Sequence, residues 1–289
     1  MPKINKISKI QNLRERYFNA LKNEDNLVEI LNEAEIGENV YNSNAIENST
    51  LSLDDTEKIL LQIDLDRYVN ERELFEAKNL ARVMEYIYKN SKDKELDINM
   101  MLFLHKILLS NINDNIAGRF RNINERVRVG AHIAPSSDEI NPRLYIMFNK
   151  YYGGNDNDIV KKISRFHLDF EYIHPFVDGN GRIGRVLNNY LLIREGYVPI
   201  NIKFLDRHKY YSAFREFQDA EKTEIMEEIV YFALTNSYHK RLAYMENKKI
   251  IKLSDYSKKY KISHSNLINK ANRQTIEAFL EKGIWKIGV

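Results

Sequence analysis

The chain has 289 residues, of which 43% are hydrophobic and 29% charged, and its formal net charge at pH 7 is +3. A chain of this length can bury one large core and a smaller appendage, and a net charge this small gives no argument by itself for nucleic acid as a partner. No cysteine, HExxH pattern or Cys/His cluster is present to bind zinc. With zero cysteine, no apolar run of membrane length and no hydrophobic segment after Met1, we expect a cytoplasmic protein that does not span a membrane.

Helical periodicity dominates the chain. Apolar residues recur at spacings of three and four in several long segments, and this spacing predicts helices there. The segments are 10–31, 54–63, 74–89, 98–110 and 159–173. Residues 52–55 resemble a capping box at the start of the second segment.

Two polar residues stand four apart in a segment rich in helix formers, 43–48. They are Ser43 and Glu47, with the sequence Ser-Asn-Ala-Ile-Glu-Asn between 43 and 48. On a helix both side chains face the same way, so they can reach one common partner.

A short hairpin is predicted around residue 130. Apolar and polar residues alternate from Val127 through Arg128 to Val129, and Gly130 closes the run, which favours a strand pair over a helix. We expect His132 to lie in a loop, and residues 152–158 form a second loop by their Gly, Asn and Asp content.

Residues 174–185, HPFVDGNGRIGR, form the densest cluster of functional groups. Asp178 offers the kind of oxygen ligand that Mg²⁺ accepts beside phosphate oxygens. Gly179 and Gly181 let backbone N–H groups approach an anion. The apolar pattern over residues 182–195 predicts a helix whose positive N-terminal end faces this loop.

The same cluster contains two guanidinium groups and one imidazole. Arg182 and Arg185 are three apart and share a helix face, an arrangement suited to a polyphosphate. His174 adds a group that can accept a proton near neutral pH. Together these residues predict a site for nucleotide transfer.

Further along, residues 210–218 follow a helical pattern, and Gln218 lies two turns beyond Tyr211. An aromatic stripe at this spacing fits a core helix as well as a ligand pocket. His105 and His167 fall within amphipathic helices, and we expect them in the core rather than as ligands.

The character of the chain changes after residue 245. Residues 261–265 suggest a turn between two short helices, and 284–287 a strand, an order that resembles a helix-turn-helix with a trailing wing. Residues 263–270 would enter a DNA groove. A module that packs or recruits a target protein is at least as good an interpretation, because the unit is short and its recognition helix carries few cations.

The 174–185 segment resembles the signature of the Fic family, His-Pro-Phe-x-(Asp/Glu)-Gly-Asn-Gly-Arg-x-x-Arg, at every fixed position. The resemblance implies an adenylyltransferase that moves AMP from ATP onto a Tyr, Thr or Ser hydroxyl of a target protein or of itself. His174 would be the general base and Asp178 would hold Mg²⁺. The residues implied to bind the nucleotide phosphates are Gly179, Asn180, Gly181, Arg182 and Arg185.

Other segments match further features of that family. Ser43 and Glu47 fit its inhibitory motif, (Ser/Thr)-x-x-x-Glu-(Gly/Asn), which implies that Glu47 competes with the ATP γ-phosphate for Arg185. The same glutamate could align water to remove AMP again. The hairpin would be the flap that docks the target, through Val127, Arg128, Val129 and Gly130, and Tyr211 and Gln218 would line the adenine pocket.

We therefore expect a mainly α fold: a Fic-type helical bundle with a short β-hairpin flap and a small C-terminal winged helix-turn-helix-like module. The expected parts are an N-terminal region over 1–97 with the inhibitory motif, a catalytic core over 98–244 and the module over 245–289. That module would contact DNA or protein, and the chain could form homo-oligomers.

A DNA-binding nucleotide sensor is the alternative function, but sensing needs no base such as His174. Doc-like phosphoryl transfer is disfavoured, because that subgroup carries Lys where Gly181 stands.

Overall fold

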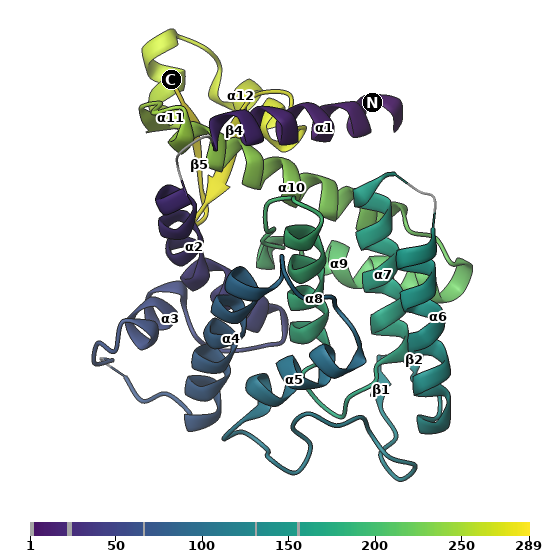
Figure 1. Cartoon of the computed structure of the whole chain (residues 1–289). Helices are drawn as coiled ribbons and strands as arrows, with labels where there is room; N and C mark the ends of the chain where they lie inside the picture. Colours follow the sequence, from purple (N-terminus) through teal and green to yellow (C-terminus); the bar gives the residue numbers. More distant parts are fainter. Residues whose placement is uncertain (1–2, 22–24, 66, 131, 155–156) are drawn as a thin grey trace. The chain divides into compact units, whose positions relative to one another are not determined.

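The computed structural model describes residues 3–21, 25–65, 67–130, 132–154 and 157–289. Within these ranges the chain forms twelve α-helices and five short strands, which confirms the predicted mainly helical fold (Figure 1). No helix in these ranges is both long enough and apolar enough to cross a membrane. The chain divides into two compact units, which we call the central unit, residues 36–230, and the terminal unit, residues 1–35 and 231–289. The part boundaries expected at 97/98 and 244/245 stay a prediction.

The central unit contains most of the helices. Helix α2, Asp25–Ile46, enters it from the terminal unit, and α10, Glu224–Met245, leaves it. Between them lie α3 Leu53–Leu60, α4 Glu71–Asn90, α5 Ile98–Leu109, β1 Arg128–Val129, β2 His132–Ile133, α6 Ile140–Gly153, α7 Ile159–Ile173, α8 Asn180–Arg194 and α9 Arg207–Ala220. Two single 3-10 turns, Ser137–Glu139 and Phe204–Asp206, precede α6 and α9.

Helix α8 forms the core of the central unit. Its residues are buried along almost the whole length, including Ile183, Leu187 and Leu191. Helices α4, α5 and α7 all pack against it. Because α8 is enclosed in this way, its N-terminal end and the loop before it are held firmly in place.

The terminal unit contains α1, Lys3–Ala20, and the C-terminal segment. There, β3 Ile250–Lys252, α11 Leu253–Tyr260, α12 His264–Asn272, β4 Ala278–Glu281 and β5 Ile284–Gly288 follow one another. The strands form an antiparallel sheet in the order β3-β5-β4. Leu253, Leu267, Ala271, Ala278 and Ile287 form its buried core.

Several element predictions need correction. The single helix expected over 10–31 corresponds to α1 and α2, and residues 22–24 between them lie outside the described ranges. The helix expected to reach residue 63 ends at Leu60, because Gln62 adopts a left-handed φ of 57°. His132 lies in strand β2 rather than in a loop, paired with Val129. Of the loop expected over 152–158, residues 152 and 153 end α6, and residues 155–156 lie outside the description.

Candidate active site

The bend at His174 is where the site begins. Helix α7 ends there in a left-handed conformation, φ 48° and ψ 60°, and the His174 N–H donates to Phe170 O. The Arg121 guanidinium fixes the bend, since its Nε donates to His174 O at 2.9 Å and its Nη2 to Ile173 O at 3.3 Å. The Arg121 N–H also donates to Pro175 O at 3.0 Å. Arg121, which sequence patterns did not single out, therefore holds the catalytic candidate by its backbone.

The loop after His174 is closed by its own side chains. The Asn180 amide accepts from Phe176 N–H and donates to Phe176 O, both at 2.9 Å. Since this buried side chain is occupied, only the Asn180 backbone N–H remains for an anion. The Phe176 ring stacks on His105 with 3.7 Å between ring centroids.

His105 is buried, as expected for a core residue, and contacts the backbone of the 174–179 loop. Its Nδ1 accepts from Gly118 N–H at 3.0 Å, so the proton lies on Nε2, which donates to Asp178 O at 3.0 Å. Burial lowers the pKa of His105 to about 4, so the ring is neutral and this tautomer is fixed. His167 is likewise buried, with its Nε2 2.8 Å from the Tyr210 hydroxyl.

Glycine is required where the loop becomes helix α8. Gly179 has φ 80°, and a Cβ there would lie 2.9 Å from Leu109. At Gly181 a Cβ would lie 2.1 Å from the Glu47 carboxylate, so that carboxylate covers the start of α8. The first N–H groups of α8 thus face a space that an anion could fill and that Glu47 now borders.

His174 is poised as a neutral base. Burial lowers its pKa to about 4, so the imidazole is unprotonated at neutral pH. Its Nδ1 lies 3.8 Å from Oε2 of Glu171, one turn earlier in α7. Burial, with a smaller contribution from the charge of Glu47, raises the pKa of Glu171 to about 8. Glu171 was not predicted, because nothing in its local sequence distinguishes it from other helix carboxylates.

Arg185 contacts both residues of the predicted inhibitory pair, Ser43 and Glu47. Its Nη2 contacts Glu47 Oε1 at 2.9 Å and Ser43 O at 2.8 Å, and its Nε donates to the Ser43 hydroxyl at 2.9 Å. Nη1 donates to the Tyr210 hydroxyl at 3.1 Å. The Arg185 side chain is 8% exposed and that of Glu47 35%. Both residues of the 43–47 pair therefore reach one partner, as their spacing predicted.

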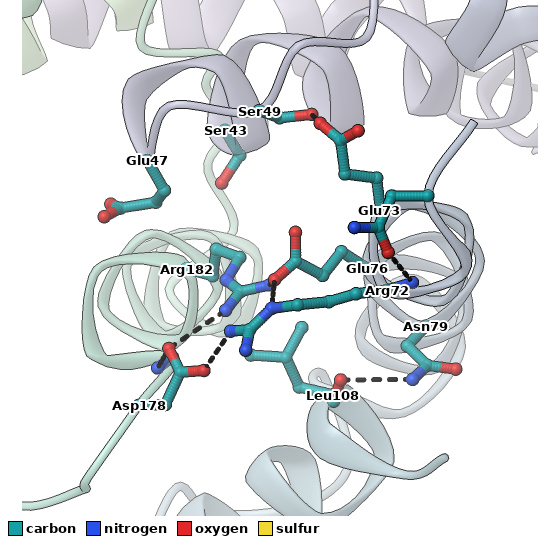
Figure 2. Close-up of polar contacts among 12 residues, drawn as sticks. Ser43, Glu47, Ser49, Arg72, Glu73, Glu76, Asn79, Leu108, Asp178 and Arg182 are labelled. Carbon is teal, nitrogen blue, oxygen red and sulfur yellow. Dashed lines mark hydrogen bonds and ion pairs between the residues drawn. The ribbon is translucent and has the colours of Figure 1, made fainter. Parts of the chain in front are cut away.

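Arg182 takes part in a second ion-pair group. It contacts Asp178 at 3.2 Å and Glu76 of α4 at 3.0 Å, and Arg72 of α4 contacts both carboxylates as well (Figure 2). Although burial alone would raise it, the pKa of Asp178 is lowered by Arg182 and Arg72. Arg72 and Glu76 come from a helix more than 100 positions upstream, so no local pattern could reveal them.

Two neighbouring hollows bring most predicted site residues together. The larger, of about 510 Å³, is lined by Glu47, Val129, Gly130, His174, Gly181, Tyr211 and Gln218 among others. The smaller, of about 370 Å³, is lined by Glu47, Arg72, Glu76, Val129, His174 and residues 177–182. Glu47, Val129, His174 and Gly181 border both. Ser43 and Arg185 lie behind Glu47 and line neither, and Arg128 also lies outside.

The hairpin β1–β2 presents apolar side chains at the rim. Val129 is 40% and Ile133 69% exposed. His132 anchors the hairpin to α7, with its Nε2 2.8 Å from Tyr172 O. Arg128 folds back so that its Nε donates to Gly130 O at 2.8 Å. The hairpin therefore exposes apolar side chains beside the hollows and is held in place by its contact with α7.

Asp178 is the residue that could hold Mg²⁺ here, together with phosphate oxygens. Among the described residues, no group of three or more His, Cys, Asp or Glu side chains could hold a metal ion by itself. Asp178 supplies one carboxylate at the wall of the smaller hollow. Protein-bound Mg²⁺ commonly takes one or two carboxylates and fills its other positions with water and phosphate oxygens, so this donor set fits metal that arrives with a nucleotide.

Residues 95–192 match the Fic/DOC family. Two relatives, each called Protein adenylyltransferase Fic, come from Nematostella vectensis and Drosophila melanogaster. The first is 32% identical over 182 residues, covering 60% of this chain and 41% of the relative. The second is 32% identical over 181 residues, covering 60% and 36%. This chain thus spans about two fifths or less of the length of these relatives.

Solved structures share the fold. A Fic domain containing signaling protein from Bacteroides thetaiotaomicron has a TM-score of 0.73 at 21% identity, covering 83% of this chain and 97% of that one. A Fic family protein from Desulfovibrio desulfuricans has a TM-score of 0.63 at 18% identity, with 97% and 95% covered. At these identities the likeness concerns architecture, and it confirms the predicted Fic-type bundle.

Proposed function

This chain carries a Fic/DOC domain at residues 95–192, and from that premise we propose that it is a protein adenylyltransferase. It would transfer AMP from ATP to a Tyr, Thr or Ser hydroxyl of a target protein or of itself. The observation that carries the proposal is the neutral His174, whose side chain is 12% exposed and borders both hollows at the N-terminal end of α8.

The reaction follows from this geometry. His174 takes the proton of the target hydroxyl while the oxygen bonds to the α-phosphorus and pyrophosphate leaves. Proton transfer of this type contributes ~10²–10⁴-fold to the rate. The α8 N-terminus, Arg182 and Arg185 would stabilise charge on the phosphates. Mg²⁺ held by Asp178 would supply further charge neutralisation on the leaving group.

Glu47 would act as an internal brake. Its carboxylate occupies one donor of Arg185 and covers Gly181, so an incoming γ-phosphate must displace it. Ser43 accepts from the same guanidinium through its hydroxyl and its backbone carbonyl and fixes its direction. Removing the Glu47 carboxylate would free Arg185 without disturbing the Ser43 contact.

The exposed hairpin would dock the target. Pairing of an extended segment with the hairpin edge gives register through backbone hydrogen bonds, which requires little of the target sequence. Val129 and Gly130 border the larger hollow, so a hydroxyl on the paired segment would arrive beside His174. Tyr211 and Gln218, which line the same hollow, would receive the adenine.

The test is incorporation of label from ATP labelled at the α-phosphate, with γ-labelled ATP in parallel. Wild type, Glu47→Gly and Glu47→Gly/His174→Ala are incubated with lysate as the source of target. We expect α-label alone, increased about tenfold or more by Glu47→Gly and lost without His174. Release of AMP from the labelled product by wild type would show that Glu47 also supports removal. No label from either nucleotide would contradict the proposal.

A second candidate function concerns residues 245–289. The order β3-α11-α12-β4-β5 with sheet order β3-β5-β4 resembles a winged helix-turn-helix. Residues 256–276 contain no acidic residue, and their five basic ones are exposed, namely Lys258, Lys259, Lys261, Lys270 and Arg273. This composition supports duplex DNA as a ligand of α12.

The DNA candidate is tested by fluorescence anisotropy with a duplex of mixed sequence at several salt concentrations. Binding that weakens steeply with salt, and that Lys270→Glu/Arg273→Glu removes, would support it. Lys209→Glu is the control, since this exposed lysine lies in α9 of the central unit. Equal binding by all three proteins, or none, would leave a protein-recruiting role as the better explanation.

A further inference from the structure

Four side chains of alternating charge close a ring beside the smaller hollow. Arg182 contacts Glu76 at 3.0 Å and Asp178 at 3.2 Å, and Arg72 Nε contacts the same Glu76 oxygen at 3.0 Å. Arg72 Nη2 completes the ring at Asp178 Oδ2 (Figure 2). The two carboxylates balance the two guanidinium groups, so the ring as a whole is neutral.

The two arginines differ in how firmly they are held. The Arg182 side chain is 4% exposed, on the buried helix α8, whereas that of Arg72 is 54% exposed, near the start of α4. Glu76, 13% exposed, stands one turn after Arg72 and steadies its Nε. In the described part of the chain, Arg72 Nη1 makes no hydrogen bond. Arg72 is therefore the member of the ring that can swing while remaining anchored at one end.

The ring would change its charge balance when metal arrives. Asp178 would hold a divalent cation less well while Arg72 contacts it, because two cations on one carboxylate repel each other. Arg72 would then keep its contact with Glu76 and have both Nη groups free to donate. The hollow it lines is also lined by Gly179, Asn180 and Gly181, at the N-terminal end of α8.

We propose that Arg72 is a further nucleotide-binding residue, which releases Asp178 to the metal and binds the phosphate chain of the nucleotide. This inference rests on the proposed function, because it assumes that ATP occupies the smaller hollow. It assigns to α4 a phosphate ligand that lies outside the 174–185 signature. Guanidinium is suited to the role because its planar donors match phosphate oxygens in pairs.

The contribution should be moderate. A hydrogen bond between charged partners is stronger than a neutral one, but the half-exposed position of Arg72 weakens it by solvent screening. We therefore expect Arg72→Gln to weaken nucleotide binding about five- to tenfold. A nucleoside without phosphate should bind equally well to both proteins.

The experiment is calorimetric titration of the full chain in the Glu47→Gly background, which frees Arg185 in every sample. Glu47→Gly, Glu47→Gly/Arg72→Gln and Glu47→Gly/Arg72→Lys are titrated with ATP, ADP and adenosine in the presence of Mg²⁺. Glu47→Gly/Arg67→Gln is the matched control, since Arg67 is an exposed arginine of the same unit paired with Asp55 at 2.9 Å, away from both hollows.

Support would be weaker binding of ATP and ADP in the Arg72→Gln chain alone, with adenosine unchanged and partial recovery by Arg72→Lys. Equal ATP affinity in the Arg72→Gln chain and its parent overturns the inference. So does a parallel loss of adenosine affinity, which would show that Arg72 only holds the structure. Binding and transfer are separate readouts: a parent that binds ATP but transfers no AMP refutes the proposed function alone. A parent that binds no ATP refutes both.

Discussion

At the scale of single residues, Glu171 is the most unusual group in the site. One of its oxygens, Oε1, is buried without a hydrogen-bond partner in the described structure, and the other lies 3.8 Å from His174 Nδ1. A carboxylate in this position costs free energy when it is charged. The pKa of about 8 means that Glu171 stays protonated at neutral pH. Glu171 is therefore a neutral neighbour of the imidazole at this pH.

This protonation makes stability depend on pH. The folded-state pKa of about 8 lies above the ordinary value of 4.5, so the favourable contribution is complete below pH 4.5 and is lost as pH rises through 8. Glu171→Gln removes the titration. We expect the melting temperature of the variant, relative to wild type, to rise by about 4 °C or more between pH 5 and pH 9. Scanning fluorimetry across this range checks it.

A constant difference between the two melting curves at every pH would show that Glu171 does not titrate in the folded state. Glu216→Gln serves as the control, because this exposed carboxylate on α9 should leave the pH dependence of wild type unchanged.

The residues found from sequence and those missed differ in one respect. His174, Asp178, Arg182 and Arg185 stand within one short segment, so their chemistry is visible as a local pattern. Glu171 is also close in sequence to His174 but looks like any other helix carboxylate, whereas Arg121 and Arg72 matter because of where their elements pass in space. Arg121 reaches His174 across 53 positions and Arg72 reaches Asp178 across 106, and no spacing rule spans such distances.

At the scale of elements, the sequence identified helices that combine one apolar face with a clear start. The α3 capping box at Ser52 and Asp55 is confirmed, with both reciprocal hydrogen bonds present. Helices α6 and α10 were missed. In α10 polar residues such as Thr235, Asn236 and Arg241 are buried together with apolar ones, which obscures the amphipathic period that sequence patterns rely on.

The crossing of α7 and α8 depends on one glycine. A Cβ at Gly184 would lie 2.7 Å from Glu171 Oε1 and 3.0 Å from His167 Cε1, and both the Glu171 Oε1 atom and the His167 side chain are buried. Alanine normally favours a helix over glycine by roughly 0.5–1 kcal/mol. Here we expect the clash to outweigh that gain, so Gly184→Ala should lower the free energy of unfolding by about 1–2 kcal/mol.

Urea denaturation measures this change, with Gly153→Ala as the matched control. A Cβ at Gly153, the last residue of α6, meets no atom within 4 Å, so that variant should be neutral. Equal stability of Gly184→Ala and wild type would mean that the two helices can separate without cost.

At the scale of the whole molecule, the two units raise the question of how each is stabilised. The terminal unit contains a buried ion-pair network in which Glu35 contacts Arg241 and Lys240, and Lys240 also contacts Glu281 at 2.6 Å. The Arg241 side chain is only 1% exposed. A buried charge without its partner is costly. Glu35 is the carboxylate that Arg241 and Lys240 share, so its loss should cost more than the loss of an exposed ion pair.

We therefore expect Glu35→Gln to destabilise the terminal unit by about 3 kcal/mol or more, since it removes the charged partner of the buried Arg241 guanidinium. Hydrogen exchange should accelerate in residues 231–289 while α8 of the central unit keeps its protection.

Glu228→Gln, in an exposed pair with Lys209, should change little. Equal acceleration throughout would show that the units unfold as one. If charge burial is the cause, Glu35→Leu/Arg241→Met should recover stability, because removing both charges removes the desolvation cost along with the attraction.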